Sequence, residues 1–365
     1  MNEIDYKTLD EIHGCLAHLA VKSNDARRRY GNERDFDPLP KNIDPFLIDI
    51  AKIQQSKGWR RLMEKTQVMT GQTNAHIRMR AGHTEEVAAH ATFIAACLGL
   101  NINMVHAVAK GHDVGHTPFG HEGESFINEK LRERNPSAAG GFKHENMSSI
   151  VFESIERCGI GLNLTHQTLT AIPQHSRGKN PLFALPDMTQ EAAVVMCADK
   201  IAYISGDFSD MERIGVPLSE ELKTEMYSLG NSQRQRTRAL VTALCRESAE
   251  EGKVSFHKCE LAQKFKHIKE LMYRVYPALN IPDGRGILER VYKFLGKFMD
   301  CKDSKPRLFC IDPLLVIALM TDKDVLLLVD GHVTGLEHLK RTSVWELLPS
   351  LHNKEINYIT PKLDW

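Results

Sequence analysis

Apolar residues recur at three- and four-residue steps through much of the chain, which is the spacing of one face of an α-helix. Val87, Ile94 and Leu98 follow this spacing in one stretch, and Ile102 and Val105 continue it in the next. Short segments that contain proline interrupt these runs, as expected of loops between helices. The pattern therefore predicts an all-α fold.

One segment, VLLLVDGHVTGL, departs from this pattern. Valine and leucine residues flank Asp330 and Gly331, a dipeptide that suits a tight turn between two antiparallel strands. We expect one small β-hairpin near 324–335, with a helix followed by a loop as the alternative. No internal repeat or low-complexity segment is evident.

The charge balance adds little to this picture. The chain has 47 basic and 47 acidic residues, so no overall field attracts nucleic acid or an anionic membrane. The basic run at Arg27–Arg29 is a local exception, and a solvated charged face is the commoner meaning of such a run.

Two further features bear on the cellular environment. Eight cysteines are scattered without a CxxC pair, which suits reduced thiols better than a disulfide framework or a zinc ribbon. No apolar run approaches the roughly 20 residues that span a bilayer, and the first residues lack the pattern of a signal peptide. We expect a soluble protein in the cytoplasm with no membrane partner.

Chemically reactive side chains are concentrated in MVHAVAKGHDVGHTPFGHEGE (104–124). His112 and Asp113 end an apolar helical pattern there, and a glycine and a proline then impose a turn. His83 and Asp199 lie on other apolar helical stretches, where a polar side chain needs a partner. Two imidazoles and two carboxylates suit one divalent ion, such as manganese, magnesium or another first-row metal. Such an ion favours hydrolysis of a phosphate.

These residues carry a resemblance to a known family. His83, His112, Asp113 and Asp199 resemble the H…HD…D signature of the HD phosphohydrolases, and HDVGHTPFGHEGE with FKHENMSS resembles the dGTPase-like deoxynucleoside triphosphate triphosphohydrolases. The likeness covers roughly residues 25–325. It implies an HD-domain helical bundle with additional helices at both ends, packed as one body: an N-terminal helical extension (1–79), an HD phosphohydrolase core (80–215) and a C-terminal helical region (216–365).

The resemblance also implies roles for individual residues. His121 and Glu124 match the family's catalytic pair, in which Glu124 would orient the His121 ring. His116 and His144 would face the phosphates or the leaving group. The implied substrate contacts are Arg80 and Lys200 to phosphate, Tyr203 stacked on the sugar, Asp207 to the 3′-hydroxyl, and Gln67 with, more loosely, His175 on the sugar or base side.

Other interpretations remain open. Ordinary core packing accounts for Tyr203 equally well, and His121 with Glu124 could instead orient the metal ligands. His90 and His106 have no motif support and are left out of the site.

The leading functional hypothesis is hydrolysis of dGTP or a broad set of dNTPs at the α-phosphorus, which yields a deoxynucleoside and inorganic triphosphate. One alternative is an HD phosphatase or phosphodiesterase that acts on nucleoside monophosphates or cyclic nucleotides. Another is a nucleotide sensor or single-stranded nucleic-acid binder without activity. A homo-oligomer is expected by analogy, with a nucleotide effector or single-stranded DNA as a further partner.

Overall fold

The computed structural model describes residues 6–31, 42–70, 74–136, 141–176, 181–279, 281–299, 309–329 and 335–365. Helices dominate these residues, so the predicted all-α class is confirmed. The α-helices are α1 (Tyr6–Glu11), α2 (Pro45–Gln55), α3 (Lys57–Arg61), α4 (Arg80–Leu98), α5 (Ile102–Gly111), α6 (His121–Arg134), α7 (His144–Ile150), α8 (Glu156–Gly159), α9 (His166–Ala171), α10 (Gln190–Arg213), α11 (Glu220–Leu229), α12 (Gln233–Glu251), α13 (Glu260–Val275), α14 (Gly284–Gly296), α15 (Pro313–Leu319), α16 (Asp322–Val329), α17 (Leu336–Leu339) and α18 (Leu348–Leu351).

Short segments complete the fold. They are the 3-10 helices η1 (Ala17–Leu19), η2 (Ser23–Asp25), η3 (Leu62–Glu64), η5 (Ile172–His175), η6 (Tyr276–Leu279) and η7 (Ser343–Leu347), the π-helical turn η4 (Val151–Ile155), and the strands β1 (Leu182–Phe183) and β2 (Ser255–Phe256). The two strands pair antiparallel.

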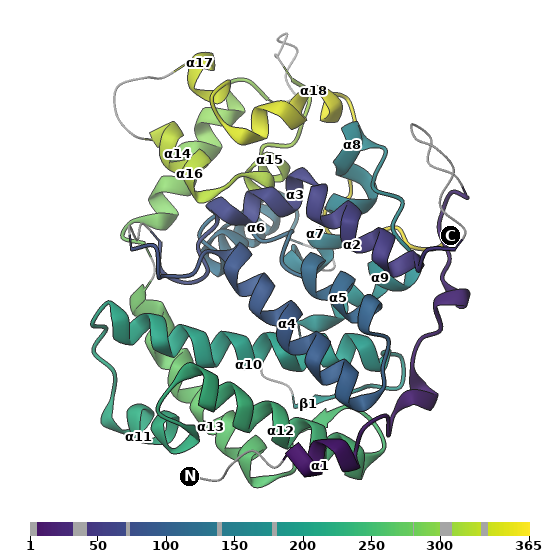
Figure 1. Ribbon diagram of the computed structural model, residues 1–365. Coiled ribbons are helices and arrows are strands. Elements are labelled where there is room, and N and C mark those ends of the chain that lie inside the picture. The colour runs from purple at the N-terminus through teal and green to yellow at the C-terminus, as the bar shows by residue number, and fades with distance from the viewer. Residues whose placement is uncertain are drawn as a thin grey trace.

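Helices α4, α5 and α10 form the centre of the molecule (Figure 1). Helix α10 is buried along most of its 24 residues, as expected of a helix that has apolar residues on all sides. Helices α11, α12 and α13 lie on one side of this centre, and α14 to α18 lie on the other side (Figure 1). The central helices carry the chemically reactive residues into the interior.

Local sequence signals set the ends of these central helices. The side chain of Asn101 accepts a hydrogen bond from the backbone N–H of Met104 and caps α5, and Thr189 caps α10 in the same way. Gly99 ends α4 with a positive φ of 79°, a conformation that glycine adopts without strain. These caps fix the residue at which α4 ends and the residues at which α5 and α10 begin.

The basic run near the N-terminus serves the fold. The guanidinium of Arg28 pairs with Asp49 at 2.7 Å and also donates to the backbone carbonyl of Asn163. Arg29 pairs with Glu153. Two of the three arginines therefore hold the N-terminal segment against the body, which removes the main reason to expect nucleic-acid binding there.

The expected hairpin is wrong for the residues that the structure describes. Residues 322–329 form helix α16, which was the alternative, while Asp330 and Gly331 lie outside the described residues. The cause is a cap that the hydrophobic pattern conceals: the hydroxyl of Thr321 accepts from the N–H of Asp324, and the Asp324 carboxylate accepts from the N–H of Thr321. This reciprocal arrangement starts a helix.

The cysteine expectation is corrected at one position. Cys310 is disulfide-bonded, whereas Cys15, Cys97, Cys158, Cys197, Cys245 and Cys259 are free. Among the described residues, no helix combines the length and the apolar character that are needed to cross a bilayer.

Candidate metal centre

The four predicted metal ligands come together in the interior. His83 lies on α4, His112 and Asp113 follow the end of α5, and Asp199 lies on α10. The Nε2 atom of His83 is 2.9 Å from Oδ1 of Asp199, and Nε2 of His112 is 3.5 Å from Oδ1 of Asp113 and 3.7 Å from Oδ1 of Asp199. All four side chains are buried. The consecutive helices α4 and α5 and the distant helix α10 thus place two imidazoles and two carboxylates around one point.

The hydrogen bonding of the two ring nitrogens of His112 is consistent with a metal ion at this point. Its Nδ1 atom lies 2.7 Å from the backbone carbonyl of Ala109 and donates to it, which leaves Nε2 with a free lone pair. That Nε2 atom is buried and has no hydrogen-bond partner among the described residues. Ligand atoms of His83, His112 and Asp113 all lie within 4.8 Å of one another. A buried imidazole lone pair beside carboxylate oxygens is an expected set of ligands for a divalent ion.

The electrostatics of the cluster favour the charged carboxylate forms of Asp113 and Asp199. Burial alone would raise the pKa of the Asp113 carboxyl, but the surrounding His112, His116 and Arg80 hold it well below its usual range. The pKa of Asp199 is also well below its usual range, because Lys200 and His83 outweigh the effect of burial. Charged carboxylates are the forms that bind metal.

A second cluster lies beside the first. Nδ1 of His144 is 2.8 Å from Oε2 of Glu124, and the rings of His144 and His116 stack with centroids 3.8 Å apart. The ring of His121 lies edge-on to both, at 5.6 Å from His116 and 6.0 Å from His144. The structure brings all four predicted catalytic residues together, and the hydrogen-bond partner of Glu124 is His144 where the sequence suggested His121.

The hydrogen bond between His144 and Glu124 shifts the pKa of both groups. Burial opposes charge on His144, but the hydrogen bond to Glu124 prevails and raises the pKa of the imidazole, while the same contact lowers the pKa of Glu124 against the effect of burial. Burial and the nearby His144 lower the pKa of His121 to about 4. Burial also holds the pKa of His116 well below its usual range, so the cluster contains one imidazole that favours the protonated form and two that favour the neutral form.

Cationic side chains border the metal centre. Nη1 of Arg80 lies 2.7 Å from Oδ2 of Asp113, and Nη2 donates to the backbone carbonyl of Gln67 at 3.1 Å. The Lys200 ammonium lies 3.0 Å from Oδ2 of Asp199. Arg80 and Lys200 thus lie beside carboxylates of the candidate metal centre, and the backbone carbonyl of Gln67 lies next to Arg80, whereas the role of the Gln67 side chain stays a prediction.

The predicted sugar contacts form a third group. The Asp207 carboxylate is 1% exposed and accepts from Nη2 of Arg78 at 2.5 Å and from the hydroxyl of Tyr276 at 3.1 Å. The rings of Tyr203 and Tyr276 are 5.0 Å apart. Burial raises the pKa of Asp207 to about 7, although Arg78 opposes this shift.

The sequence analysis did not identify Arg78 or Tyr276 as residues of this group. For Arg78, one sequence feature was informative, namely the glycine at position 206. A Cβ atom at Gly206 would lie 1.9 Å from Nη1 of Arg78, so the glycine of the SGD sequence leaves space for that guanidinium. Tyr276 follows α13, far along the chain from Asp207, and no local pattern connects the two residues.

Lys65 and Asp322 were missed for the same reason. The buried Lys65 ammonium donates to the backbone carbonyl of His116. The Asp322 carboxylate accepts from the backbone N–H groups of Thr66 at 3.0 Å and Phe119 at 2.9 Å. Both residues hold the loop between α5 and α6 in place.

His175 lies close to the predicted metal ligands, whereas the resemblance placed it on the sugar or base side. Its ring centroid lies 4.8 Å from that of His112, and its Nε2 atom is 3.9 Å from Oδ1 of Asp113. It borders the metal side of the site.

Comparisons with known proteins agree with this geometry. A family model described as HD domain matches residues 80–204, which include all four predicted metal ligands. A relative from Caldanaerobacter subterraneus subsp. tengcongensis is 37% identical and the match covers 70% of this chain and 69% of the relative. Relatives from Clostridium tetani and Clostridium perfringens are 33% and 36% identical and are matched over 79% and 73% of their lengths, with 76% and 68% of this chain. All three bear the name deoxyguanosinetriphosphate triphosphohydrolase-like protein.

Proposed function

Because the chain belongs to the deoxyguanosinetriphosphate triphosphohydrolase-like family of HD-domain proteins, we propose that it hydrolyses deoxynucleoside triphosphates. The reaction cleaves at the α-phosphorus and releases a deoxynucleoside and inorganic triphosphate. The observation that supports it most is the buried group of His83, His112, Asp113 and Asp199, in which Arg80 contacts one carboxylate and Lys200 the other.

His83, His112, Asp113 and Asp199 would hold one divalent ion, manganese, magnesium or another first-row metal. A bound ion of this kind polarises a phosphoryl oxygen and lowers the pKa of bound water. The protein's part is to place Arg80 and Lys200 where negative charge accumulates on the phosphate. Charge-assisted hydrogen bonds from these side chains stabilise that charge in a site whose protein groups are buried.

Proton transfer falls to the second cluster. His144, held by Glu124 and favouring the protonated form, supplies a proton to the leaving group or to a phosphate oxygen. His121 remains neutral at physiological pH and keeps a lone pair for an incoming proton. His116, stacked on His144, fixes the plane of that ring.

Selectivity for the sugar rests on the third group. The Tyr203 ring packs beneath the deoxyribose, so that a 2′-hydroxyl meets an apolar surface, and Asp207 accepts from the 3′-hydroxyl. Gln67 reaches the sugar or base side. In the free protein the Asp207 carboxylate is already aligned by Arg78 and Tyr276.

The test incubates the purified protein with each dNTP separately, with manganese or magnesium, and separates the products by chromatography. We expect inorganic triphosphate and deoxynucleoside, and neither in the Asp113→Ala variant. Pyrophosphate with a nucleoside monophosphate would contradict the cleavage position. Faster turnover of a monophosphate or a cyclic nucleotide would favour the phosphatase alternative, and binding without turnover, in dNTP mixtures as well, would favour a sensor.

Two features of the wider proposal need separate measurements. A homo-oligomer predicts a mass by light scattering that is a multiple of the 41.3 kDa chain. A cytoplasmic location predicts that a tagged protein fractionates with cytoplasmic enzymes.

A further inference from the structure

A strained backbone turn precedes helix α6. The turn runs from Thr117 to Gly120, and the N–H of Gly120 donates to the carbonyl of Thr117 at 3.3 Å. Pro118 occupies the second position of the turn, and Phe119 occupies the third position with a positive φ of 58°. Turns with proline second and a positive φ third usually have glycine there, because the Cβ atom of any other residue crowds the backbone. Phe119 therefore keeps this conformation only if its surroundings hold it.

The turn sets the position of one residue of the second cluster. It leads directly into His121, the first residue of α6. Gly120 makes the connection with φ 57° and ψ −125°, a conformation that glycine adopts far more readily than other residues. A Cβ atom at Gly120 would lie 3.4 Å from Nη2 of Arg80, so the turn also lies close to the guanidinium beside the metal centre. The direction in which His121 projects thus depends on the backbone of Phe119 and Gly120.

One carboxylate from the C-terminal region holds the turn. Oδ1 of Asp322, the first residue of α16, accepts from the N–H of Phe119 at 2.9 Å. Oδ2 accepts from the N–H of Thr66 at 3.0 Å and from the hydroxyl of the same residue. Asp322 is 5% exposed, so water competes little for these hydrogen bonds. The side chain therefore joins the strained turn to two segments that are far from it in the sequence.

The two segments that Asp322 contacts depend on it to different extents. Thr66 has a further anchor, because it forms an antiparallel bridge with Met79. Within the described part of the chain, the N–H of Phe119 donates to Asp322 alone. Loss of the carboxylate should therefore loosen the turn more than it loosens the segment around Thr66.

We propose that Asp322 is a positioning residue for the reaction, which keeps Phe119 in its left-handed conformation and thereby keeps the His121 ring edge-on to His116. This inference rests on the proposed function and adds to it a residue from outside the HD core. The hydrogen bonds of Asp322 go to Thr66 and Phe119, neither of which is a predicted metal ligand or substrate contact. Its effect on catalysis passes through the backbone of the turn.

Asp322→Ala tests this role by removing both acceptor oxygens. We expect kcat for a dNTP to fall about tenfold to a hundredfold, because a small misplacement of a catalytic group has effects of this size. KM should change by less than about threefold, because the predicted phosphate contacts Arg80 and Lys200 remain. A kcat within about twofold of that of the parent protein would overturn the proposal.

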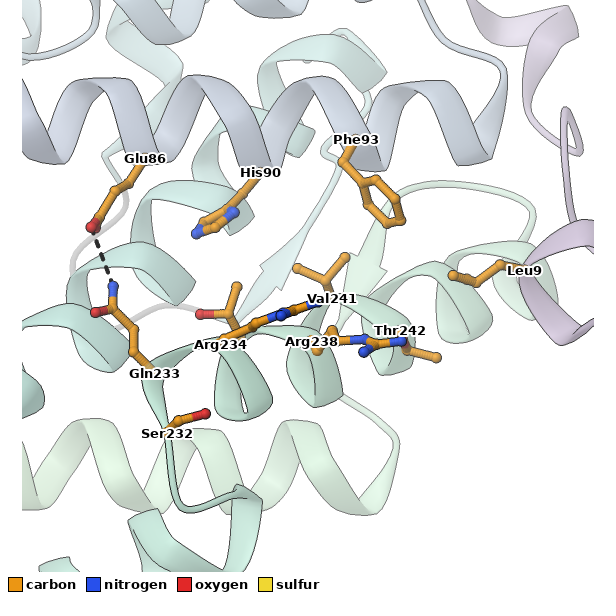
Figure 2. Close-up of a pocket in the computed structure, with 11 residues that line it drawn as sticks. Leu9, Glu86, His90, Phe93, Ser232, Gln233, Arg234, Arg238, Val241 and Thr242 are labelled. Carbon is orange, nitrogen blue, oxygen red and sulfur yellow. Dashed lines mark hydrogen bonds between the residues drawn. The ribbon is translucent and has the colours of Figure 1, made fainter. Parts of the chain in front are cut away.

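The matched control lies on α12. This helix faces α4 across a cavity that no residue of the turn lines (Figure 2). Near the end of α12, the buried carboxylate of Glu247 accepts from the backbone N–H groups of His257 and Cys259, so it likewise holds a loop. Glu247→Ala should lower the melting temperature and keep kcat. Equal losses of kcat in Asp322→Ala and Glu247→Ala would reduce Asp322 to a purely structural residue and overturn the proposal.

Glycine at position 119 separates the turn from the other contacts of Asp322. Glycine adopts a positive φ without strain, so Phe119→Gly should make the turn independent of the carboxylate. In that background we expect Asp322→Ala to lower kcat by less than about threefold. Phe119→Asn provides a second background, because asparagine also tolerates this conformation. The same loss of kcat in all three backgrounds would show that Asp322 acts through Thr66 and would contradict the proposal.

The placement of His121 is also measurable without turnover. Its ring resonance in protein labelled at histidine is assigned by its absence in His121→Gln. We expect this resonance to move in Asp322→Ala and to stay in place in Glu247→Ala, and an unmoved resonance in Asp322→Ala would overturn the proposal. A parent protein that turns over no dNTP would fail the proposed function, whereas the resonance would still decide whether Asp322 positions His121.

Discussion

The imidazole of His83 meets the carboxylate of Asp199 at 2.9 Å across 116 residues of sequence, because α4 packs against α10 in the centre of the fold. This contact brings the first and the last residue of the H…HD…D signature together. Neither residue alone makes a site, and the geometry depends on the packing of two long buried helices.

Replacement of Asp199 by asparagine should remove the metal and leave the fold. The amide retains the size of the side chain and the contact with His83 but supplies no negative charge for the ion. We expect metal content, measured by atomic emission, to fall to background and dNTP turnover to fall at least about a thousandfold, since the ion contributes several kcal/mol to the transition state. Asp187→Asn, an exposed aspartate, is the control and should keep both.

Replacement of Glu124 by glutamine should shift the pH profile of the reaction. Glu124 raises the pKa of His144, so activity that needs protonated His144 is present at low pH and is lost as the pH rises through that raised pKa. Without the carboxylate the pKa of His144 falls, so this limb of the profile should move to lower pH. NMR titration of the His144 ring measures the shift directly. An unchanged titration would show that Glu124 does not control the ring.

The stability of the protein offers a check on Arg78. Its guanidinium pairs with Glu86, Asp207 and Asp210 and is largely buried, and removal of one partner from a buried ion pair costs about 3–5 kcal/mol. We therefore expect Arg78→Ala to lower the free energy of unfolding in urea by about this amount. Arg213→Ala removes a partner of the same Asp210 at the surface and should cost less than about 1 kcal/mol. Equal losses would contradict the role of Arg78.

Much of the fold and of the candidate metal centre was predictable because the relevant signals are local. The three- and four-residue spacing predicted the helices, and the four predicted metal ligands lie in sequence motifs that are readable one at a time. The structure adds only that these motifs converge. Their convergence follows from the burial of polar groups, each of which needs a partner inside an apolar core.

The remainder depended on tertiary packing. Glu124 pairs with His144 because α6 and α7 place the two side chains together, whereas the three-residue spacing within the sequence had suggested His121. The contact of Tyr276 with Asp207 joins residues 69 apart, and no pattern records it. The segment of helix α16 was predicted to be a strand because its run of apolar residues fits both the helical and the strand periodicity. The Thr321 cap favours the helix.

The Tyr203 ring provides the last test, because its two interpretations predict different results. If the ring lies under the deoxyribose, Tyr203→Ala should admit a 2′-hydroxyl, and the preference for dGTP over GTP in kcat/KM should fall by about tenfold or more. If the ring only packs against Tyr276, the variant loses stability while the preference remains. Competition between the two nucleotides in one reaction measures the preference independently of enzyme concentration. Tyr227→Ala, an exposed tyrosine on α11, is the matched control and should leave the preference unchanged.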